Sequence, residues 1–182
     1  MKRMPHKIVI SGPESTGKTE LAAYLAGTFK GLILPEYARS YVENLDRRYT
    51  YADVEHIAGV QEQEFTQAMQ KGYGYVFLDT YLVITKVWFQ EAFGRMPEWI
   101  DGRLRLAGID LFLLCYPDLE WVEDGVRENP GERRTYLFER YRAEIAGLHR
   151  PFEVIRGCGE ERFRNALAAM HRHFPDSLNT IS

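Results

Sequence analysis

Residues 12–19 read Gly-Pro-Glu-Ser-Thr-Gly-Lys-Thr and match the pattern G-x-x-x-x-G-K-[ST], which can cradle a polyphosphate. The two glycines allow positive φ and a close backbone approach, so that successive N–H groups can converge on phosphate oxygens. Lys18 is expected to neutralise the β and γ phosphates, and the Thr19 hydroxyl is expected to ligate Mg²⁺. The pattern therefore predicts binding of ATP or GTP. The residues expected to bind this nucleotide are Gly12, Glu14, Ser15, Thr16, Gly17, Lys18 and Thr19.

Two acidic residues each follow a short apolar run, where they could act on a nucleotide held by residues 12–19. Asp79 is expected to hold Mg²⁺ together with Thr19, although an aspartate here also suits the N-cap of a helix. The carboxylate of Glu36 is expected to orient an acceptor hydroxyl and accept its proton. The alternative for Glu36 is a surface pair with Arg39 at the start of a helix. The residues alone leave open whether Glu36 or Asp79 is the catalytic base.

Three arginines, Arg127, Arg133 and Arg134, surround a Pro-Gly turn that precedes an amphipathic helix. Arginines aimed into a site are typical of a lid that closes over a transferring phosphoryl group. We expect Arg127 and Arg134 to be catalytic and Arg133 to contact the nucleotide, without deciding which arginine matters most. The alternative is a solvated turn in which Glu128 and Glu132 are the ion-pair partners, and such pairs contribute little.

Several further side chains are candidates for an acceptor pocket. Aromatic residues crowd positions 81–99 and could stack a flat acceptor, but filling a core is the favoured explanation. Gln61 falls on the apolar face of a predicted helix, so its amide needs a partner, either a substrate or, slightly favoured, a neighbouring backbone group. Thr50 and Asp53 have the spacing of a capping box, which assigns them to structure.

The elements that must position these residues alternate between strand and helix along the chain. Strands are expected near residues 8–10, 32–34, 75–78, 111–115 and 152–155, and helices from residue 18 and over residues 54–69, 82–93, 99–106, 132–148 and 160–173. This order predicts an α/β fold of three layers, with a parallel sheet covered by helices on both faces. Ligands bind such sheets at the carboxyl ends of the strands, where the expected site residues fall. The length of 182 residues suits a single domain over residues 1–182.

Composition narrows the class of protein further. A net charge of -3 and the absence of a Lys/Arg run argue against a nucleic-acid partner. The two cysteines, Cys115 in an apolar run and Cys158 beside glycines, argue for a reducing compartment and against a disulfide framework. The basic start is followed by too short an apolar run for a signal peptide, and no stretch is long enough to cross a bilayer. We expect a cytoplasmic protein without a membrane partner, and the sequence leaves its oligomeric state open.

Four blocks together resemble a known family: GPESTGKTEL, PEYARSYVE, FLDTYLVITKVWF and WVEDGVRENPGERR. They are similar to the P-loop ATPase and kinase family that includes the ribosylnicotinamide kinase domain of bacterial bifunctional NadR proteins. The resemblance covers nearly all of the chain, and its second and fourth blocks are the more diagnostic. It implies an ATP-dependent small-molecule kinase, with a sheet and an arginine-containing lid like those of nucleoside and nucleotide kinases. It also implies that ribosylnicotinamide is phosphorylated to nicotinamide mononucleotide.

The sequence departs from that family in one notable position and leaves two alternatives. The family often reads LDTD after the third strand, whereas Tyr81 replaces the second acid here, which opens the identity of the acceptor. No adenylyltransferase segment with an HxGH-type site and no helix-turn-helix is recognised, so we expect a stand-alone kinase-like unit. The first alternative is a kinase for another nucleoside or a vitamin. The second is a regulatory ATPase or nucleotide-sensing module, which needs no acceptor pocket.

Overall fold

A computed structural model of the chain describes residues 4–125 and 127–176. Its centre is a five-stranded, fully parallel sheet with the order β2-β3-β1-β4-β5. The strands are β1 (His6–Ser11), β2 (Leu32–Leu34), β3 (Tyr75–Asp79), β4 (Leu111–Cys115) and β5 (Phe152–Ile155). Because β1 lies in the middle, its carboxyl end has strand ends on both sides, and the loop that follows it lies where a ligand binds in such sheets.

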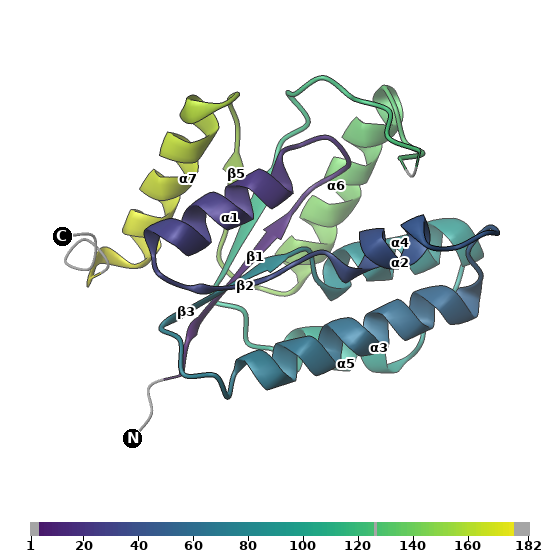
Figure 1. Cartoon of the computed structure of the whole chain (residues 1–182), viewed down its shortest axis with the longest axis horizontal. Helices are drawn as coiled ribbons and strands as arrows, with labels where there is room; N and C mark the ends of the chain where they lie inside the picture. Colours follow the sequence, from purple (N-terminus) through teal and green to yellow (C-terminus); the bar gives the residue numbers. More distant parts are fainter. Residues whose placement is uncertain (1–3, 126, 177–182) are drawn as a thin grey trace.

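Helices cover both faces of this sheet, which gives the three layers visible in Figure 1. The helices are α1 (Lys18–Thr28), α2 (Tyr37–Glu43), α3 (Tyr51–Ala68), α4 (Leu82–Phe93), α5 (Trp99–Leu106), α6 (Glu132–Gly147) and α7 (Glu160–His173). Helices α1 and α7 pack on one face through one apolar cluster, and α3, α4, α5 and α6 pack on the other through a second. The predicted α/β class and three-layer arrangement are confirmed.

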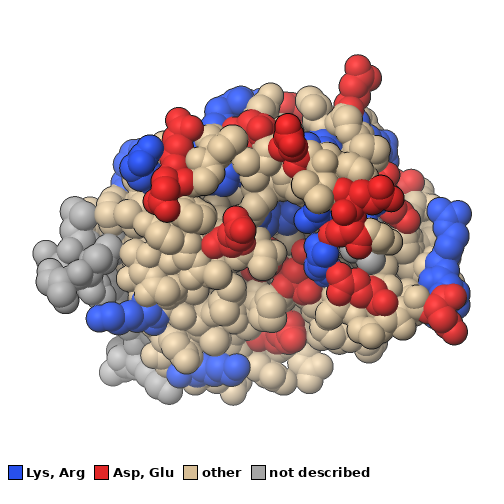
Figure 2. Space-filling model, turned by 45° about the horizontal axis from the view of Figure 1, so that its top comes forward, with Lys and Arg blue, Asp and Glu red and all other residues tan. Residues whose placement is uncertain are grey.

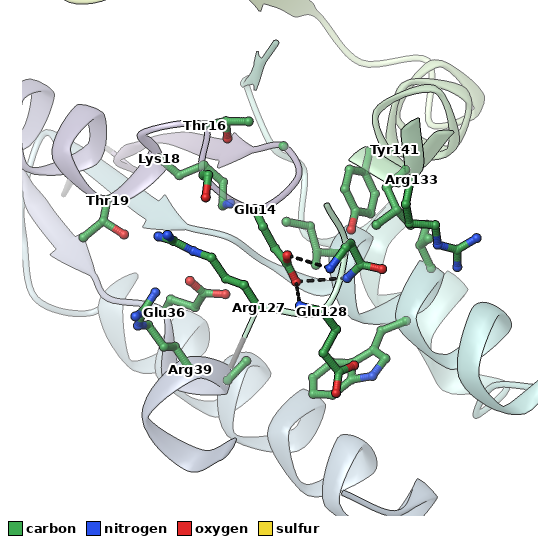
Figure 3. Close-up of a pocket in the computed structure, with 18 of the residues that line it drawn as sticks. Glu14, Thr16, Lys18, Thr19, Glu36, Arg39, Arg127, Glu128, Arg133 and Tyr141 are labelled. Atoms are coloured by element: carbon green, nitrogen blue, oxygen red, sulfur yellow. Dashed lines mark hydrogen bonds between the residues drawn. The ribbon is translucent and has the colours of Figure 1, made fainter. Parts of the chain in front are cut away.

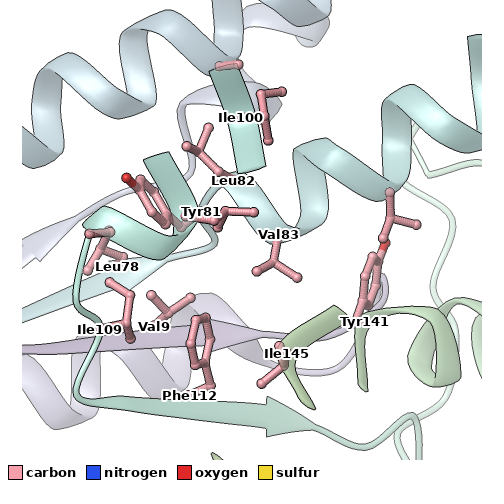
Figure 4. Close-up of a cluster of buried hydrophobic side chains, with 14 of the residues drawn as sticks. Val9, Leu78, Tyr81, Leu82, Val83, Ile100, Ile109, Phe112, Tyr141 and Ile145 are labelled. Carbon is pink, nitrogen blue, oxygen red and sulfur yellow. The ribbon is translucent and has the colours of Figure 1, made fainter. Parts of the chain in front are cut away.

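Alternate residues of each strand supply these two clusters, because successive side chains of a strand point to opposite faces. In β1, Ile8 and Ile10 belong to the cluster beneath α1 and α7, whereas Val9 belongs to the other. Figure 4 shows Val9 and Phe112 in that second cluster, below the α4 side chains and beside Ile145 of α6. All of these side chains are fully buried, so the sheet is a rigid platform for the loops at its edge.

The predicted elements agree with the structure except for α2, which is absent from the expected helices and enters only through the alternative in which Glu36 stands at the start of a helix; Glu36 is indeed its N-cap. The capping box at the start of α3 is confirmed, with Thr50 and Asp53 bonded reciprocally. Both cysteines are free, Cys115 buried and Cys158 exposed. The prediction of a single domain over the whole chain stays a prediction. Of the helices in the described ranges, none combines the length and the apolar character that a bilayer crossing requires.

Candidate active site

The loop of residues 12–19 joins β1 to α1, with its two glycines in conformations that other residues adopt poorly. Gly12 has a φ of 144°, and a Cβ there would lie 2.7 Å from the carbonyl oxygen of Cys115 in β4. Gly17 has a φ of 71° and is the residue immediately before α1. Both glycines are therefore needed for the tight turn between β1 and α1, as the sequence predicted. This turn directs the N-terminus of α1 toward the space that the loop encloses.

Two buried arginines hold the outer side of this loop. Arg134, at the start of α6, donates to the carbonyl oxygens of Glu14 and Ser15 at 3.1 and 3.0 Å, and to that of Leu119 at 2.9 Å. Arg162, in α7, donates to the carbonyl oxygen of Thr16. Three consecutive carbonyls are thus turned toward arginines. Since the N–H groups of a chain point away from such carbonyls, this arrangement favours N–H groups that face a bound anion.

Lys18 and Thr19 follow this anchored segment. In the structure, the Lys18 ammonium donates to the carbonyl oxygen of Pro13 at 2.8 Å, across the loop. The Thr19 hydroxyl donates to Oδ2 of Asp79 at 2.6 Å, which joins the start of α1 to the end of β3. This bond brings together the two residues that the sequence expects to hold Mg²⁺, and that role stays a prediction.

The residues Thr19 and Asp79 also fit a hard divalent cation. Asp79 Oδ1 is buried and has no hydrogen-bond partner among the described residues, and burial raises the pKa of this carboxyl although Thr19 and Lys18 oppose the effect. A buried carboxylate oxygen without a partner beside a hydroxyl is the donor chemistry that Mg²⁺ prefers, directly or through water. The role of Asp79 as an N-cap is not seen, since Tyr81 is the residue before α4.

Glu36 lies between β2 and α2 and faces the same space as Lys18. Burial raises the pKa of its carboxyl; the Lys18 ammonium works in the opposite direction, and Asp79 adds to the rise. The alternative pairing with Arg39 is not formed, because the Arg39 guanidinium binds Glu43 at 2.8 Å and Asp124 at 2.6 Å. Figure 3 shows the Glu36 carboxylate on the wall opposite Lys18. A carboxylate whose pKa is raised by burial is a stronger proton acceptor when ionised, which suits a general base.

The loop between β4 and α6 carries Arg127 and lies over the cavity where the sequence expects a lid, and its closure stays a prediction; its residue Val126 lies outside the described residues. The Arg127 guanidinium donates to the carbonyl oxygen of Val122 at 2.6 Å and pairs with Asp124 at 3.1 Å. Figure 3 shows Arg127 reaching across the space between Glu36 and Lys18. Arg133 instead binds Glu91 of α4 at 2.7 Å, at the rim.

These residues enclose one cavity of about 640 Å³. Figure 2 shows the corresponding side of the molecule, where basic and acidic side chains meet in a hollow of the surface. The phosphate-loop end is lined by residues 14–19 of the loop, and the opposite end by α2, α4 and the chain before α3. The opposite end is largely apolar and aromatic, with Val42, Tyr49, Ile84 and Trp88. Such a cavity has the volume and the mixed lining of a small-molecule site.

Two of the sequence candidates lie elsewhere than expected. Arg134 is buried among backbone carbonyls and does not line the cavity, so the geometry gives it a supporting contact rather than an approach to phosphate. Tyr81 is also buried, and its hydroxyl donates to Glu62 of α3 at 2.6 Å, away from the cavity. The Gln61 amide finds its partner in the Thr85 hydroxyl at 2.7 Å, a side chain rather than a substrate or a backbone group.

Sequence reasoning missed three contributors to this site. Arg162 lies in an ordinary amphipathic helix and gave no signal, because its partner Thr16 is 146 positions away. Trp121 and Asn129 both donate to the Glu14 side chain at 3.2 and 2.9 Å. The one available signal for these two was their position in the block WVEDGVREN, beside the predicted lid arginines.

With this geometry in place, comparison with known proteins assigns the family. A family model described as an AAA domain matches residues 7–162. The chain belongs to this family. The AAA-domain match includes the phosphate loop, Glu36, Asp79, the lid and Arg162, so it covers the cavity described above.

Two curated relatives of this AAA-domain protein are the trifunctional NAD biosynthesis/regulator proteins NadR of Escherichia coli strain K12 and Salmonella typhimurium strain LT2. Each is 29% identical over 124 residues, which are 66% of this chain and 30% of the relative. The chain therefore spans less than a third of the length of these relatives. The resemblance to NadR seen in the sequence is confirmed.

Solved structures extend the comparison to the fold. A crystal structure of NadR in complex with NR has a TM-score of 0.75 and 25% identity, covering 96% of this chain and 53% of that chain. A crystal structure of NadR in complex with NAD and AMP-PNP has a TM-score of 0.68 and 24% identity, covering 93% of this chain and 50% of that chain. The structure of a deoxyadenosine kinase from M. mycoides has a TM-score of 0.63 and 15% identity, covering 91% of this chain and 99% of that chain. The last two show the same fold.

Proposed function

We propose that this protein is an ATP-dependent kinase that transfers the γ-phosphoryl group to a hydroxyl of a nucleoside-like molecule, with ribosylnicotinamide as the first candidate. One observation carries the proposal: Lys18 and Glu36 line the same cavity, which continues beyond them to an aromatic wall. A nucleotide-sensing module needs only the first of these parts. A kinase needs all of them, because an acceptor must lie beside the γ-phosphate within reach of a base.

The phosphate loop would bind and orient the donor. Its N–H groups and the start of α1 face the phosphates, and Lys18 would exchange its bond to Pro13 for one to the β and γ oxygens. Thr19 and Asp79 are the residues that would hold Mg²⁺, which when bound neutralises charge on the phosphates. Arg127, which reaches across the cavity from the lid, would stabilise the charge that develops on the transferring group.

Glu36 would take the proton of the acceptor hydroxyl. Its raised pKa makes the carboxylate a stronger base than an exposed glutamate, and it faces Lys18 and Arg127 across the cavity. Closure of the lid against α2 and α4 would exclude water, so that an acceptor is favoured over hydrolysis.

The choice of ribosylnicotinamide rests on the relatives. The NadR proteins are named for NAD biosynthesis, and one solved NadR structure holds NR. A flat heteroaromatic base suits the end of the cavity lined by Tyr49 and Trp88, which pack edge to face on each other and together form an aromatic wall. Tyr81 does not line the cavity, so its side chain does not obstruct an acceptor, although the second acid of the family is absent at this position.

The test is a Glu36→Gln variant assayed with ATP, offering ribosylnicotinamide first and ordinary nucleosides second. We expect the variant to keep its ATP affinity and to lose phosphoryl transfer by roughly 10²- to 10⁴-fold, the usual contribution of a positioned base. In the wild type, kcat/KM should fall as the pH drops through the raised pKa of Glu36, because the carboxylate is the active form; this acid limb should vanish in the variant. Glu55→Gln, an equal charge change at an exposed position of α3, is the control.

Three outcomes separate the candidates. A phosphorylated product from ribosylnicotinamide that is lost in Glu36→Gln supports the proposal in full. A product from another nucleoside alone keeps the kinase and changes its acceptor. If no acceptor raises ATP turnover above basal hydrolysis and Glu36→Gln behaves as wild type, the kinase is replaced by the nucleotide-sensing module.

A further inference from the structure

The side chain of Glu14 connects the phosphate loop to the lid through four hydrogen bonds. Its Oε1 accepts from the backbone N–H of Glu128 at 3.0 Å and from the Asn129 side-chain amide at 2.9 Å. Its Oε2 accepts from the backbone N–H of Asn129 at 3.0 Å and from the Trp121 indole at 3.2 Å. A carboxylate has about four lone-pair sites, so this one is saturated by donors from a single loop.

The neighbouring residue provides a second connection of the same kind. The Ser15 hydroxyl accepts from the backbone N–H of Val122 at 3.1 Å, and the carbonyl of Val122 accepts from Arg127. Glu14 and Ser15 thus bind lid residues that precede Arg127 in the sequence, and Glu14 also binds the two residues that follow it. Figure 3 shows the Glu14 carboxylate directed to the lid side of the cavity, with dashed lines to its donors there, among them Glu128.

A carboxylate is an unexpected residue beside a phosphate cradle, because its charge repels the phosphates. Its four donors hold that charge on the lid side, and charge-assisted bonds of this kind are stronger than neutral ones. A neutral side chain would avoid the repulsion but would bind the lid less strongly. The position of Glu14 is therefore better explained by the lid than by nucleotide binding through its side chain.

We infer that Glu14 is a positioning residue: its carboxylate fastens Trp121, Glu128 and Asn129 to the phosphate loop and so sets Arg127 over the transferring phosphoryl group. The effect on turnover rests on the proposed function, but the fastening itself does not. The backbone of Glu14 belongs to the phosphate cradle, whereas its side chain acts through the lid.

Amide hydrogen exchange, followed residue by residue by NMR on the protein without nucleotide, tests the fastening. In Glu14→Ala the N–H groups of Glu128 and Asn129 lose their acceptor, so their exchange should quicken by about five- to tenfold, as expected for one lost hydrogen bond. Glu14→Gln retains one acceptor oxygen and should give a smaller increase. Glu123→Gln removes an exposed carboxylate from the same loop and should leave both rates unchanged.

Steady-state kinetics with the best acceptor test the consequence. Glu14→Ala should lower kcat by roughly tenfold or more while leaving the Kd for ATP within about threefold, and Gln should restore part of the loss. Asn129→Ala should lower kcat less in the Glu14→Ala background than in the wild type, because both substitutions break the same connection.

The two measurements fail separately. Unchanged exchange at Glu128 and Asn129 in Glu14→Ala would overturn the inference, as would a loss confined to ATP affinity with kcat intact. Suppose that no acceptor is phosphorylated, but that amide exchange is fastest in Glu14→Ala, intermediate in Glu14→Gln and slowest in the wild type. The proposed function is then wrong, and the fastening by Glu14 is supported.

Discussion

The two walls of the cavity are supported by the same type of residue in opposite environments. Behind the phosphate-loop wall, Arg134 and Arg162 do not line the cavity; they have exposed fractions of 6% and 2% and donate mainly to backbone carbonyls. On the lid and acceptor wall, the side chains of Arg39, Arg127 and Arg133 are 40%, 23% and 43% exposed and pair with carboxylates. Arginines thus fix the backbone conformation of the phosphate loop on one side of the cavity. On the other side they form ion pairs that can be exchanged for contacts with water or a ligand.

Burial accounts for this division of roles. A buried arginine that loses its partners leaves an uncompensated charge and unpaired carbonyls, so its contacts are costly to break. An exposed ion pair exchanges its partner for water at little cost. The phosphate-loop wall should therefore stay fixed during a reaction cycle, whereas the lid wall can release its pairs and form new ones with a ligand.

The largest effect is expected from Arg162. Arg162→Met removes donors from the carbonyls of Thr16, Tyr116 and Gly157 and from the carboxylate of Asp118. The free energy of unfolding should fall by about 3–5 kcal/mol, the cost of breaking a buried pair, and ATP affinity should fall with it. Denaturant unfolding and nucleotide titration measure the two. Arg164→Met, at an exposed position of the same helix, should change stability by less than about 0.5 kcal/mol; an equal loss in both variants would contradict the comparison.

Arg127 and Arg134 give the next contrast, because the sequence predicted the same role for both. Arg127→Ala should lower kcat by roughly 10²- to 10³-fold with little change in the Kd for ATP, as for a donor aimed at developing charge. Arg134→Ala should instead weaken ATP binding and lower the midpoint of thermal unfolding, because the carbonyls of Glu14 and Ser15 lose their donor. Identical kinetic profiles for the two variants would remove the distinction between the walls.

The phosphate-loop wall was largely predictable from sequence, and the reason is local. Eight consecutive residues define the loop. The carboxyl ends of parallel strands lie at one edge of the sheet, so Glu36 and Asp79 come to that edge independently of their side-chain contacts. The supporting contacts were not predictable. Arg162 stands two residues before Arg164 in one amphipathic helix, and their sequence contexts do not reveal that one is buried against Thr16.

The misplaced and missed features have local physical causes as well. Helix α2 is only seven residues long and buries none of them fully, so its apolar positions cover about two turns, too short a stretch for a helical period to be recognised. The chain turns at Thr80, whose φ is 68°, and the next side chain, Tyr81, lies in the core against α3 instead of the cavity. The side-chain partners of Glu14 lie more than 100 positions away, and the spacing of the motif carries no information about them.

The smallest effect is expected on the exposed wall, at Arg39, which ties α2 to the lid through Asp124 and pairs with Glu43 within α2. Arg39→Gln should reduce the free energy of unfolding by less than about 1 kcal/mol, because exposed pairs contribute little and are screened by salt. Glu43→Gln removes the helical pair alone, and its cost should be about 0.3–0.5 kcal/mol at most. Urea unfolding at low and at high salt measures both, and the difference from wild type should shrink at high salt. Arg39 and Arg162 each hold an aspartate in the chain between β4 and α6. A loss in Arg39→Gln as large as that in Arg162→Met would mean that exposure does not decide which arginines build this site.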